Sequence, residues 1–307
     1  MKLTFLGTGA GSPSMTRNVS SLGLQWTQRG SLWLFDAGEG TQQQILRSPL
    51  RLSQLEHIYV THLHGDHVFG LPGLLASRSL VKDILSPVTL FGPLGLDEWL
   101  RVTLQVTGTG IRYPLTVQTV SEGLIYEDEA RQVFCRRLAH RIVSYGYAVV
   151  EKPRPGTFDA AQASALGIPP GPLYGRLKAG ESLTLPDGQV VNGAMLVGPP
   201  RPGRKVVVCG DTGATPAIAE LAAGADVLVH EATFLSEQAD RAAASGHSTA
   251  AGAATAAREA GVGTLILTHI SPRYESDSES RLGELQAEAQ AIFPNTLLAR
   301  DFWSYEV

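Results

Sequence analysis

Three of the eight histidines of the chain lie within seven residues. The stretch "THLHGDH" begins at Thr61 and places Asp66 among His62, His64 and His67. One interpretation is a polar turn. The other is a metal site, because imidazole nitrogens combined with a carboxylate oxygen form a donor set that suits zinc, manganese or iron, whereas calcium prefers oxygen ligands alone.

The spacing inside this cluster suits two neighbouring ions. His62 and His64 are two residues apart, so in an extended chain their side chains point to the same side. Gly65 permits a sharp turn, after which Asp66 and His67 can face a second position. Two ions about 3.5–4 Å apart are the usual apparatus for hydrolysing phosphodiesters and other esters.

Further ligand candidates stand at the ends of apolar, strand-like runs. "HIYVTH" ends at His62, "FCRRLAH" at His140, "VVVCGD" at Asp211 and "LILTH" at His269. A single histidine in such a place is usually structural. In layered α/β folds, however, ligands bind beyond the carboxyl ends of strands, so we expect these four ends to meet at one rim. Asp211 has two oxygens with which to bridge two ions.

Short β-branched runs alternate with amphipathic stretches along most of the chain. Strands are predicted over residues 2–7, 31–36, 57–62, 88–92, 132–140, 145–151, 205–211, 226–232 and 264–269, and helices over 40–47, 96–107, 215–224, 248–259 and 280–293. Ser248 is expected to cap the fourth helix and Gly261 to close it. Strands interleaved with helices predict an α/β layered fold.

Residues 151–203, which we call the arm, break this pattern. They hold nine of the 18 prolines and nine glycines, with few strand-like runs. A linker would separate two complete domains, but strands resume at once from Lys205. The arm is therefore interpreted as a projecting insertion within one domain that spans residues 1–307.

The composition limits the class of protein. A hydrophobic content of 43% with 18% charged residues is ordinary for a globular enzyme, and no apolar run approaches the roughly 18 residues of a membrane helix. The net charge of −4 argues against a general nucleic-acid coat, although a bound dication can still attract RNA. The N-terminus has no signal-peptide pattern, and Cys135 and Cys209 form no disulfide framework, so a cytoplasmic protein without a membrane partner is expected.

At these motifs the chain resembles a known family. "THLHGDH" is similar to the H-x-H-x-D-H motif of the metallo-β-lactamase superfamily. The resemblance to one member family, the ribonuclease Z endonucleases of tRNA 3′ processing, runs nearly from end to end. It rests on "FLGTGAGSP", "FDAGEGTQQQI", "HLHGDHVFGLPGLL", "GPLYGRLKAG", "GDT", "HEATF", "GHS" and "LTHISPRY". It implies an αββα sandwich with the arm inserted, two zinc ions per chain (or manganese or iron) and a homodimer.

The resemblance also implies roles for particular residues. One metal would be held by His62, His64 and His140, the other by Asp66, His67 and His269, with Asp211 bridging the two. Asp66 would also orient or deprotonate the attacking water. Glu231 would orient His247, the proton donor to the leaving 3′ oxygen. The implied reaction is removal of the 3′ trailer of precursor tRNA by attack of metal-bound hydroxide on a phosphodiester, which leaves a 3′-hydroxyl on the tRNA.

Within the arm, "GIPPGPLYGRLKAGE" resembles a tRNA-binding exosite. Gly171 and Pro172 would shape it, while Arg176 and Lys178 would contact phosphates. Because the arm carries five basic and four acidic side chains, shape must contribute to its affinity.

Two further segments are expected to contact the RNA. Residues 13–18, "PSMTRN", resemble a P-x-K-x-R-N loop that helps to place the tRNA 3′ end. Arg17 and Asn18 match, but Met15 replaces the lysine, which leaves open where cleavage falls relative to a CCA sequence. Arg273 closely follows a ligand candidate and is expected to clamp a phosphate.

Two alternatives belong to other functional classes. One is a broad-specificity phosphodiesterase, lactonase or thioester hydrolase of the same fold, but a small substrate gives no reason for the arm. The other is a non-catalytic, metal-stabilised RNA-binding subunit. The complete ligand set together with Glu231 and His247 argues against that.

Overall fold

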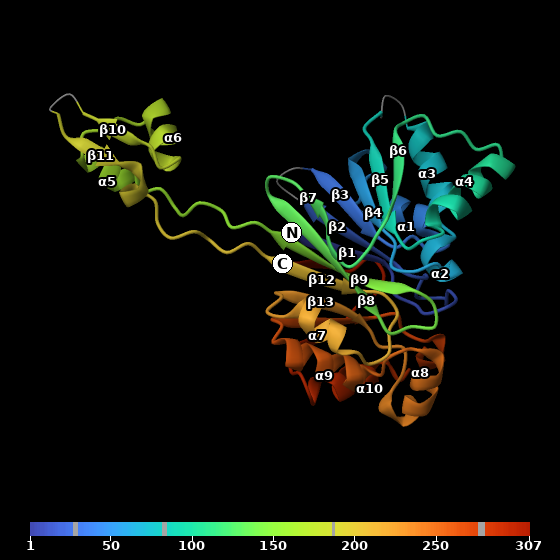
Figure 1. Ribbon diagram of the computed structural model, residues 1–307. Helices are drawn as coiled ribbons and strands as arrows, with labels where there is room; N and C mark the ends of the chain where they lie inside the picture. Colours follow the sequence, from blue (N-terminus) through green and yellow to red (C-terminus); the bar gives the residue numbers. More distant parts are fainter. Residues whose placement is uncertain (27–29, 82–84, 186–187, 276–279) are drawn as a thin grey trace. The chain divides into compact units, whose positions relative to one another are not determined.

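The computed structural model describes residues 1–26, 30–81, 85–185, 188–275 and 280–307 (Figure 1). These residues form two compact units. The first comprises residues 1–127, 132–149 and 205–307, and the second comprises residues 128–131 and 150–204. The arm thus belongs to the second unit.

One seven-stranded sheet of the first unit is built from the N-terminal part of the chain and one C-terminal strand. Its order is β16 (Ser304–Glu306), β1 (Lys2–Gly7), β2 (Ser21–Trp26), β3 (Ser31–Phe35), β4 (Leu55–Tyr59), β5 (Val88–Gly92) and β6 (Leu115–Thr119). Strands β16 to β3 are antiparallel to their neighbours, whereas β3 to β6 run parallel. The parallel part brings the carboxyl ends of β3, β4 and β5 to one edge.

The other seven-stranded sheet is built from later segments. Its order is β15 (Thr296–Leu298), β14 (Thr264–Thr268), β13 (Val227–Glu231), β12 (Lys205–Cys209), β9 (Ser144–Glu151), β8 (Arg131–Leu138) and β7 (Gly123–Glu127). Strands β12 to β15 are parallel, and β7 pairs antiparallel with β8. The ends of β12 and β14 therefore lie at the same edge of this sheet.

Helices cover the outer faces of both sheets (Figure 1). The first sheet carries α1 (Thr41–Leu46), α2 (Gly65–Val68), α3 (Leu71–Leu80) and α4 (Leu96–Val106). The second carries α7 (Pro216–Ala222), α8 (Ala239–Ser245), α9 (Ala250–Ala260) and α10 (Leu282–Gln290). This arrangement of helices, sheet, sheet and helices confirms the predicted αββα sandwich.

Apolar side chains hold the four layers together. A central cluster between the sheets includes Phe35 and Tyr59 from the first sheet and Val208 and Val229 from the second. Two outer clusters fix the helices to the sheets. The stripe of α9 that faces the second sheet is alanine, namely Ala250, Ala253, Ala254, Ala257 and Ala260. Such small side chains let this helix approach the sheet closely.

The ends of α9 give one confirmation and one correction. Gly261 closes the helix with φ of 61°, as predicted, since glycine adopts the left-handed region without a steric penalty. The expected cap at Ser248 is wrong. Thr249 caps the helix by accepting the Gly252 N–H, while the Ser248 hydroxyl donates to the Thr212 carbonyl.

The second unit contains regular structure that the proline and glycine pattern does not predict. It holds α5 (Ala160–Ala165), α6 (Pro172–Lys178), β10 (Ser182–Thr184), β11 (Val190–Asn192) and a 3₁₀ turn at Gly193–Leu196. Its own core consists of Ala163, Ile168, Leu177, Leu183, Val191 and Leu196. The arm is therefore folded rather than a long irregular loop.

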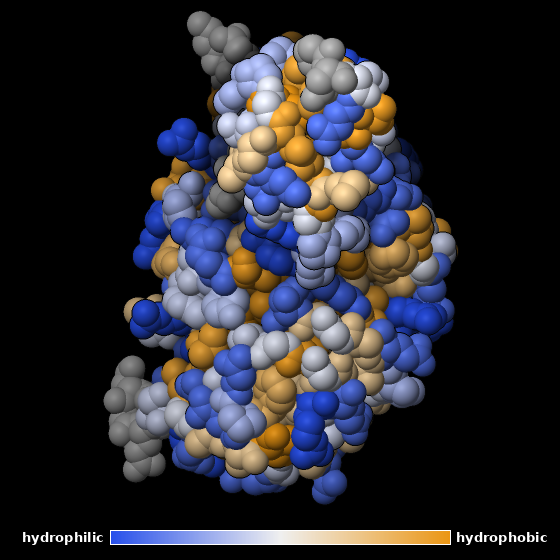
Figure 2. Space-filling model, turned by 90° about the vertical axis from the view of Figure 1, so that its left-hand side faces the viewer, coloured by the Kyte–Doolittle hydropathy of each residue, from blue (hydrophilic) through white to orange (hydrophobic). Residues whose placement is uncertain are grey.

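The surface carries no large apolar belt on the face drawn in Figure 2, where hydrophilic and hydrophobic residues are interspersed. Among the described residues, no helix has the length and apolar character needed to cross a bilayer.

Candidate metal centre

Seven side chains converge where the predicted strands end, and they fall into two groups. In each group, one ligand atom per residue lies within 4.8 Å of the others. The first group is His62, His64, His140 and Asp211, and the second is Asp66, His67, Asp211 and His269. The structure thus brings together all seven ligand candidates, and Asp211 belongs to both groups.

In the first group, the ring nitrogens point at one another. His62 Nε2 lies 3.0 Å from His64 Nδ1, and His140 Nε2 lies 3.3 Å from the same atom. One oxygen of Asp211 is 3.5 Å from His62 Nε2. These three rings and one carboxylate surround a single position.

The second group has the same character. Asp66 Oδ2 lies 3.4 Å from His67 Nε2 and 3.3 Å from His269 Nε2. The other oxygen of Asp211 lies 3.4 Å and 3.3 Å from the same two nitrogens. The two oxygens of Asp211 therefore face different groups, as a bridging carboxylate requires.

Asp36 and Thr61 fix the tautomers of two ligand histidines. The single hydroxyl proton of Thr61 is donated to Asp36 Oδ2 at 2.8 Å, so Thr61 must accept from His62 Nδ1 at 3.0 Å. The same oxygen of Asp36 accepts from His67 Nδ1 at 2.7 Å. In the neutral form of each ring, which metal binding requires, it is the unprotonated Nε2 that faces the centre.

Two more ligand histidines are held in the same way. His140 Nδ1 donates to the Gly246 carbonyl at 2.6 Å. The Thr233 hydroxyl donates to Glu231 at 2.6 Å and therefore accepts from His269 Nδ1 at 3.0 Å. In all four histidines Nδ1 has a partner, so it is Nε2 that faces the centre and would bind a cation.

This set of nitrogen and oxygen donors suits a metal ion. His67 Nε2 is buried and has no hydrogen-bond partner among the described residues, which is costly unless a cation or water satisfies it. Burial lowers the pKa of His62 to about 2, so its ring stays neutral and able to coordinate. Burial opposes ionisation of Asp66, but the adjacent rings of His269 and His67 outweigh it and hold the pKa of Asp66 below its usual range.

The backbone around the centre is unusual at two strand ends. Asp36 has φ of 58° and His269 has φ of 55°, values that non-glycine residues seldom adopt. Such conformations persist where the surrounding structure enforces them, commonly at functional sites. Gly210 allows a close approach as well, because a Cβ there would lie 2.5 Å from Thr61 Cβ.

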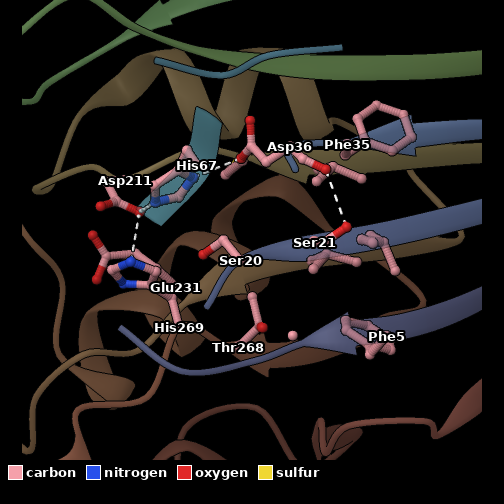
Figure 3. Close-up of a pocket in the computed structure, with 15 residues that line it drawn as sticks. Phe5, Ser20, Ser21, Phe35, Asp36, His67, Asp211, Glu231, Thr268 and His269 are labelled. Atoms are coloured by element: carbon pink, nitrogen blue, oxygen red, sulfur yellow. Dashed lines mark hydrogen bonds and ion pairs between the residues drawn. The ribbon is translucent and has the colours of Figure 1, made fainter. Parts of the chain in front are cut away.

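On its interior side, the centre adjoins a small cavity between the sheets. Figure 3 shows His67 between Asp36 and Asp211, with Ser21 and Thr268 nearby on the cavity wall. The cavity has a volume of about 30 Å³, which is room for about one ordered water.

Glu231 and His247 form an ion pair beside the ligands. His247 Nδ1 lies 2.8 Å from Glu231 Oε1, which also accepts the Thr212 N–H at 2.9 Å. Burial lowers the pKa of His247, but the Glu231 carboxylate outweighs it and raises that pKa above its usual value. The His247 side chain is 17% exposed and lines the cleft that holds His64 and Asp66.

Arg17 anchors the loop at residues 13–18 from the interior, and its side chain is not exposed to solvent. Arg17 is buried, and its Nε lies 2.6 Å from a Glu275 carboxylate oxygen. The Asn18 amide donates to the Glu39 carbonyl, and Met15 is almost fully exposed. Sequence alone could not place Arg17 inside, because its carboxylate partner is 258 residues away.

Two arginines line the cleft over the ligands. Arg273 is exposed, donates to the Ser271 hydroxyl at 2.9 Å and lies over the Phe234 ring. The other is Arg241 on α8, which sequence reasoning missed because no motif marks it. Behind the ligands, the buried His230 donates to the Glu231 carbonyl at 2.7 Å.

The remaining candidates lie in the second unit, around α6. Gly171 precedes this helix and Pro172 is its first residue, a position that tolerates proline. Arg176 pairs with Glu181 at 2.8 Å, and Lys178 is exposed in the last turn.

The fold and the paired ligand groups define a protein of the metallo-β-lactamase superfamily. A family model described as "Beta-lactamase superfamily domain" matches residues 175–270, and one described as "Anti-Pycsar protein Apyc1" matches residues 1–109. Among solved structures, human tRNase Z, short form, is 31% identical with a TM-score of 0.72 and covers 100% of this chain and 99% of that one. The fold protein YhfI from Bacillus subtilis, at 17% identity and a TM-score of 0.68, shares the fold over 100% and 99% of the two chains.

Relatives with higher sequence identity identify the member family within this superfamily. Ribonuclease Z of Brevibacillus brevis is 53% identical over 100% of this chain and 97% of its own length. Ribonuclease Z of Trichodesmium erythraeum is 52% identical over 100% and 95%. The chain belongs to the ribonuclease Z family, which confirms the expected enzyme class, a metal-dependent endoribonuclease.

Proposed function

We propose that this enzyme removes the 3′ trailer of precursor tRNA with two zinc ions in the centre. The observation that carries the proposal is the pair of ligand groups sharing Asp211, beside which the Glu231–His247 pair lines the same cleft. The family relationship to ribonuclease Z and the likeness to human tRNase Z support the choice of substrate.

The residues present fit two divalent ions. One would be held by His62, His64 and His140, the other by Asp66, His67 and His269, with Asp211 between them. Zinc suits this nitrogen and oxygen set, and manganese or iron are the alternatives. When bound, such ions lower the pKa of water and neutralise charge that develops on phosphoryl oxygens.

The side chains around the ions handle the protons. Asp66 Oδ2, the oxygen that lies near His67 Nε2 and His269 Nε2, also accepts the Gly11 N–H at 2.9 Å. We assign to this carboxylate the orientation and deprotonation of the attacking water. His247 gives a proton to the leaving 3′ oxygen of the tRNA. Glu231 orients that ring and favours its protonated form, and a general acid of this kind contributes about 10²–10⁴-fold in rate.

Recognition of the RNA is assigned to cations and to shape. Arg176 and Lys178 on α6, with Gly171 and Pro172 at its start, form the proposed exosite. At the cleft, Arg273 is proposed to contact a phosphate. Asn18 and the loop that Arg17 anchors are proposed to place the tRNA 3′ end.

We also propose a cytoplasmic homodimer. Exposed large apolar side chains gather on the outer helices α3 and α4, where Leu80 is 77% and Val106 is 81% exposed, and a second copy of the chain would cover them. The two cysteines are buried free thiols, which suits a reducing compartment.

The test is cleavage of precursor tRNA, with and without an encoded CCA, by metal-replete protein. The expected products are a tRNA with a 3′-hydroxyl and a trailer with a 5′-phosphate, formed in proportion to zinc restored after chelation. Absence of cleavage under conditions in which the protein hydrolyses a small phosphodiester would contradict the proposed substrate.

A further inference from the structure

An exposed aromatic side chain stands next to the metal-ligand loop and has no part in the chemistry above. Phe69 directly follows α2, two residues after the ligand His67, and is 62% exposed. Its ring faces that of Trp99 in α4, with the centroids 6.5 Å apart and the planes 30° from parallel. Both helices lie on the outer side of the first sheet (Figure 1).

The Phe69 ring is fixed against the ligand loop rather than free in solvent. A Cβ on Gly65 would lie 2.2 Å from the ring, so only glycine leaves room for it there. The Phe69 N–H donates to the Gly65 carbonyl at 2.9 Å. Since Gly65 stands between His64 and Asp66, the ring is held against the turn that carries two metal ligands.

Neighbouring apolar side chains extend this surface. Leu63 lies between two ligand histidines and, like Trp99, packs against the core of the first sheet. A Cβ on Gly95 would be 3.4 Å from Leu63, so the start of α4 contacts the ligand loop. Leu94, just before it, is 84% exposed. We call Leu63, Phe69, Leu94 and Trp99 the apolar ledge.

The chemistry of the ledge selects a nucleobase rather than a phosphate. Its four members carry no charge, and the two exposed side chains directly after Leu96 in α4 are the acidic Asp97 and Glu98, which repel phosphates. Every base has a flat face that stacks on an aromatic ring, and unpaired RNA bases are commonly bound in this way.

We propose that the ledge is a base-stacking subsite, in which an unpaired base next to the scissile phosphate stacks on Phe69. This proposal rests on the proposed function, because it requires an RNA substrate whose scissile bond reaches the ligand loop. The base belongs either to the first trailer nucleotide or to the last unpaired nucleotide of the tRNA.

The test compares Phe69→Ala, Phe69→Leu and Phe69→Trp, with Leu46→Ala at the end of α1 as the control for loss of an exposed apolar side chain. Phe69→Leu keeps an apolar contact with Gly65 but removes the aromatic face. We expect KM for precursor tRNA to rise about 5- to 100-fold in the alanine and leucine variants, and to stay near the wild-type value in Phe69→Trp and Leu46→Ala.

A direct readout comes from 2-aminopurine placed at either candidate position, with a His247→Ala background to slow cleavage. Binding should quench the 2-aminopurine fluorescence at one of the two positions in the protein that keeps Phe69 and in Phe69→Trp. It should not quench the fluorescence in Phe69→Leu. Equal KM values for Phe69→Leu and Leu46→Ala, or quenching that survives in Phe69→Leu, would overturn the subsite.

Two other outcomes are distinguishable. If Phe69→Ala lowers the molar mass in light scattering while the quenching persists, the ledge is a contact between copies of the chain and the subsite is overturned. If the wild type binds and quenches a single-stranded RNA but does not cleave precursor tRNA, the proposed function fails and the stacking stands.

Discussion

The αββα sandwich and the second unit differ in how firmly their side chains are held in place. In the sandwich, four ligand histidines have their outer nitrogen fixed by Thr61, Asp36, Gly246 or Thr233. In the second unit, six buried apolar residues form the core of the part that the structure describes. So small a core gives little stability, because burial of apolar area scales with domain size.

The difference indicates where accuracy is needed. Metal ligands must be held to within a fraction of an ångström, and the sandwich supplies that through buried hydrogen bonds. Contacts with a long RNA tolerate more movement, and the cations of α6 are correspondingly exposed. The proposals assign bond cleavage to the sandwich and discrimination among substrates to the second unit, and the following changes test that division.

Replacing the shared ligand should have the largest effect. Asp211→Ala is expected to remove metal from both groups and to lower the hydrolysis of every phosphodiester by on the order of 10³-fold or more. Metal analysis alongside kinetics checks this. Asp240→Ala, on the exposed surface of α8, is the control. Retention of two ions per chain in Asp211→Ala would contradict the bridging role.

The general-acid assignment predicts an effect that depends on the leaving group. His247→Ala should lower kcat for precursor tRNA by about 10²–10⁴-fold, because the 3′ oxygen needs a proton to leave. A substrate that releases p-nitrophenolate should lose much less, since that anion departs unprotonated, and metal content should be unchanged. Equal losses for both substrates would argue that His247 serves some other purpose.

A cavity in the second unit should leave the sandwich intact. Leu177→Ala truncates a fully buried side chain of the small core, a change that costs about 2–5 kcal/mol. We expect local opening in hydrogen exchange, a higher KM for precursor tRNA and little change with a small phosphodiester. Leu228→Ala, equally buried in the sandwich, should lower the melting temperature of the first unit. The same pattern from both variants would show that the units do not unfold separately.

The smallest expected effect is a shift in the pH dependence of kcat. The Glu231 carboxylate raises the pKa of His247, which keeps the acid form of the ring populated to higher pH. Glu231→Gln removes that charge, so the pKa falls and the basic limb of kcat for precursor tRNA should move to lower pH. A pH–rate profile of the two proteins is the measurement. If the basic limb stays at the same pH in Glu231→Gln, Glu231 does not control the protonation of His247.

Much of the site could be predicted because ligands at strand ends leave a local signal. The runs that end near Asp211 and His269 are apolar and rich in β-branched residues, the run before His140 is strand-like, and the fold brings their ends to one rim. The hydrogen bonds that orient the rings could not be predicted. Thr61 and Thr233 are ordinary threonines in sequence, and only the three-dimensional structure gives each one a carboxylate and an imidazole.

Prolines and glycines made several helices hard to predict from the sequence. Helix α3 begins with "LPGLL", and α6 carries Pro172 at its first position, so both resemble turns in sequence. Short strands such as β10 and β15 have three residues each, too few to show a period. Arg78 inside α3 is fully buried, because the carbonyls of Leu52 and Ser86 accept from its guanidinium. Those partners lie 26 and eight residues away, outside the helix, so the helix sequence does not mark this arginine as internal.

Removal of the arm tests the central division most directly. The Glu151 N–H donates to the Arg204 carbonyl at 2.9 Å, so a short Gly-Ser turn can replace residues 152–203. The account predicts that this variant loses processing of precursor tRNA while it still hydrolyses bis(p-nitrophenyl) phosphate at a rate close to that of the full chain. Parallel loss of both activities, or unchanged processing of precursor tRNA, would contradict it.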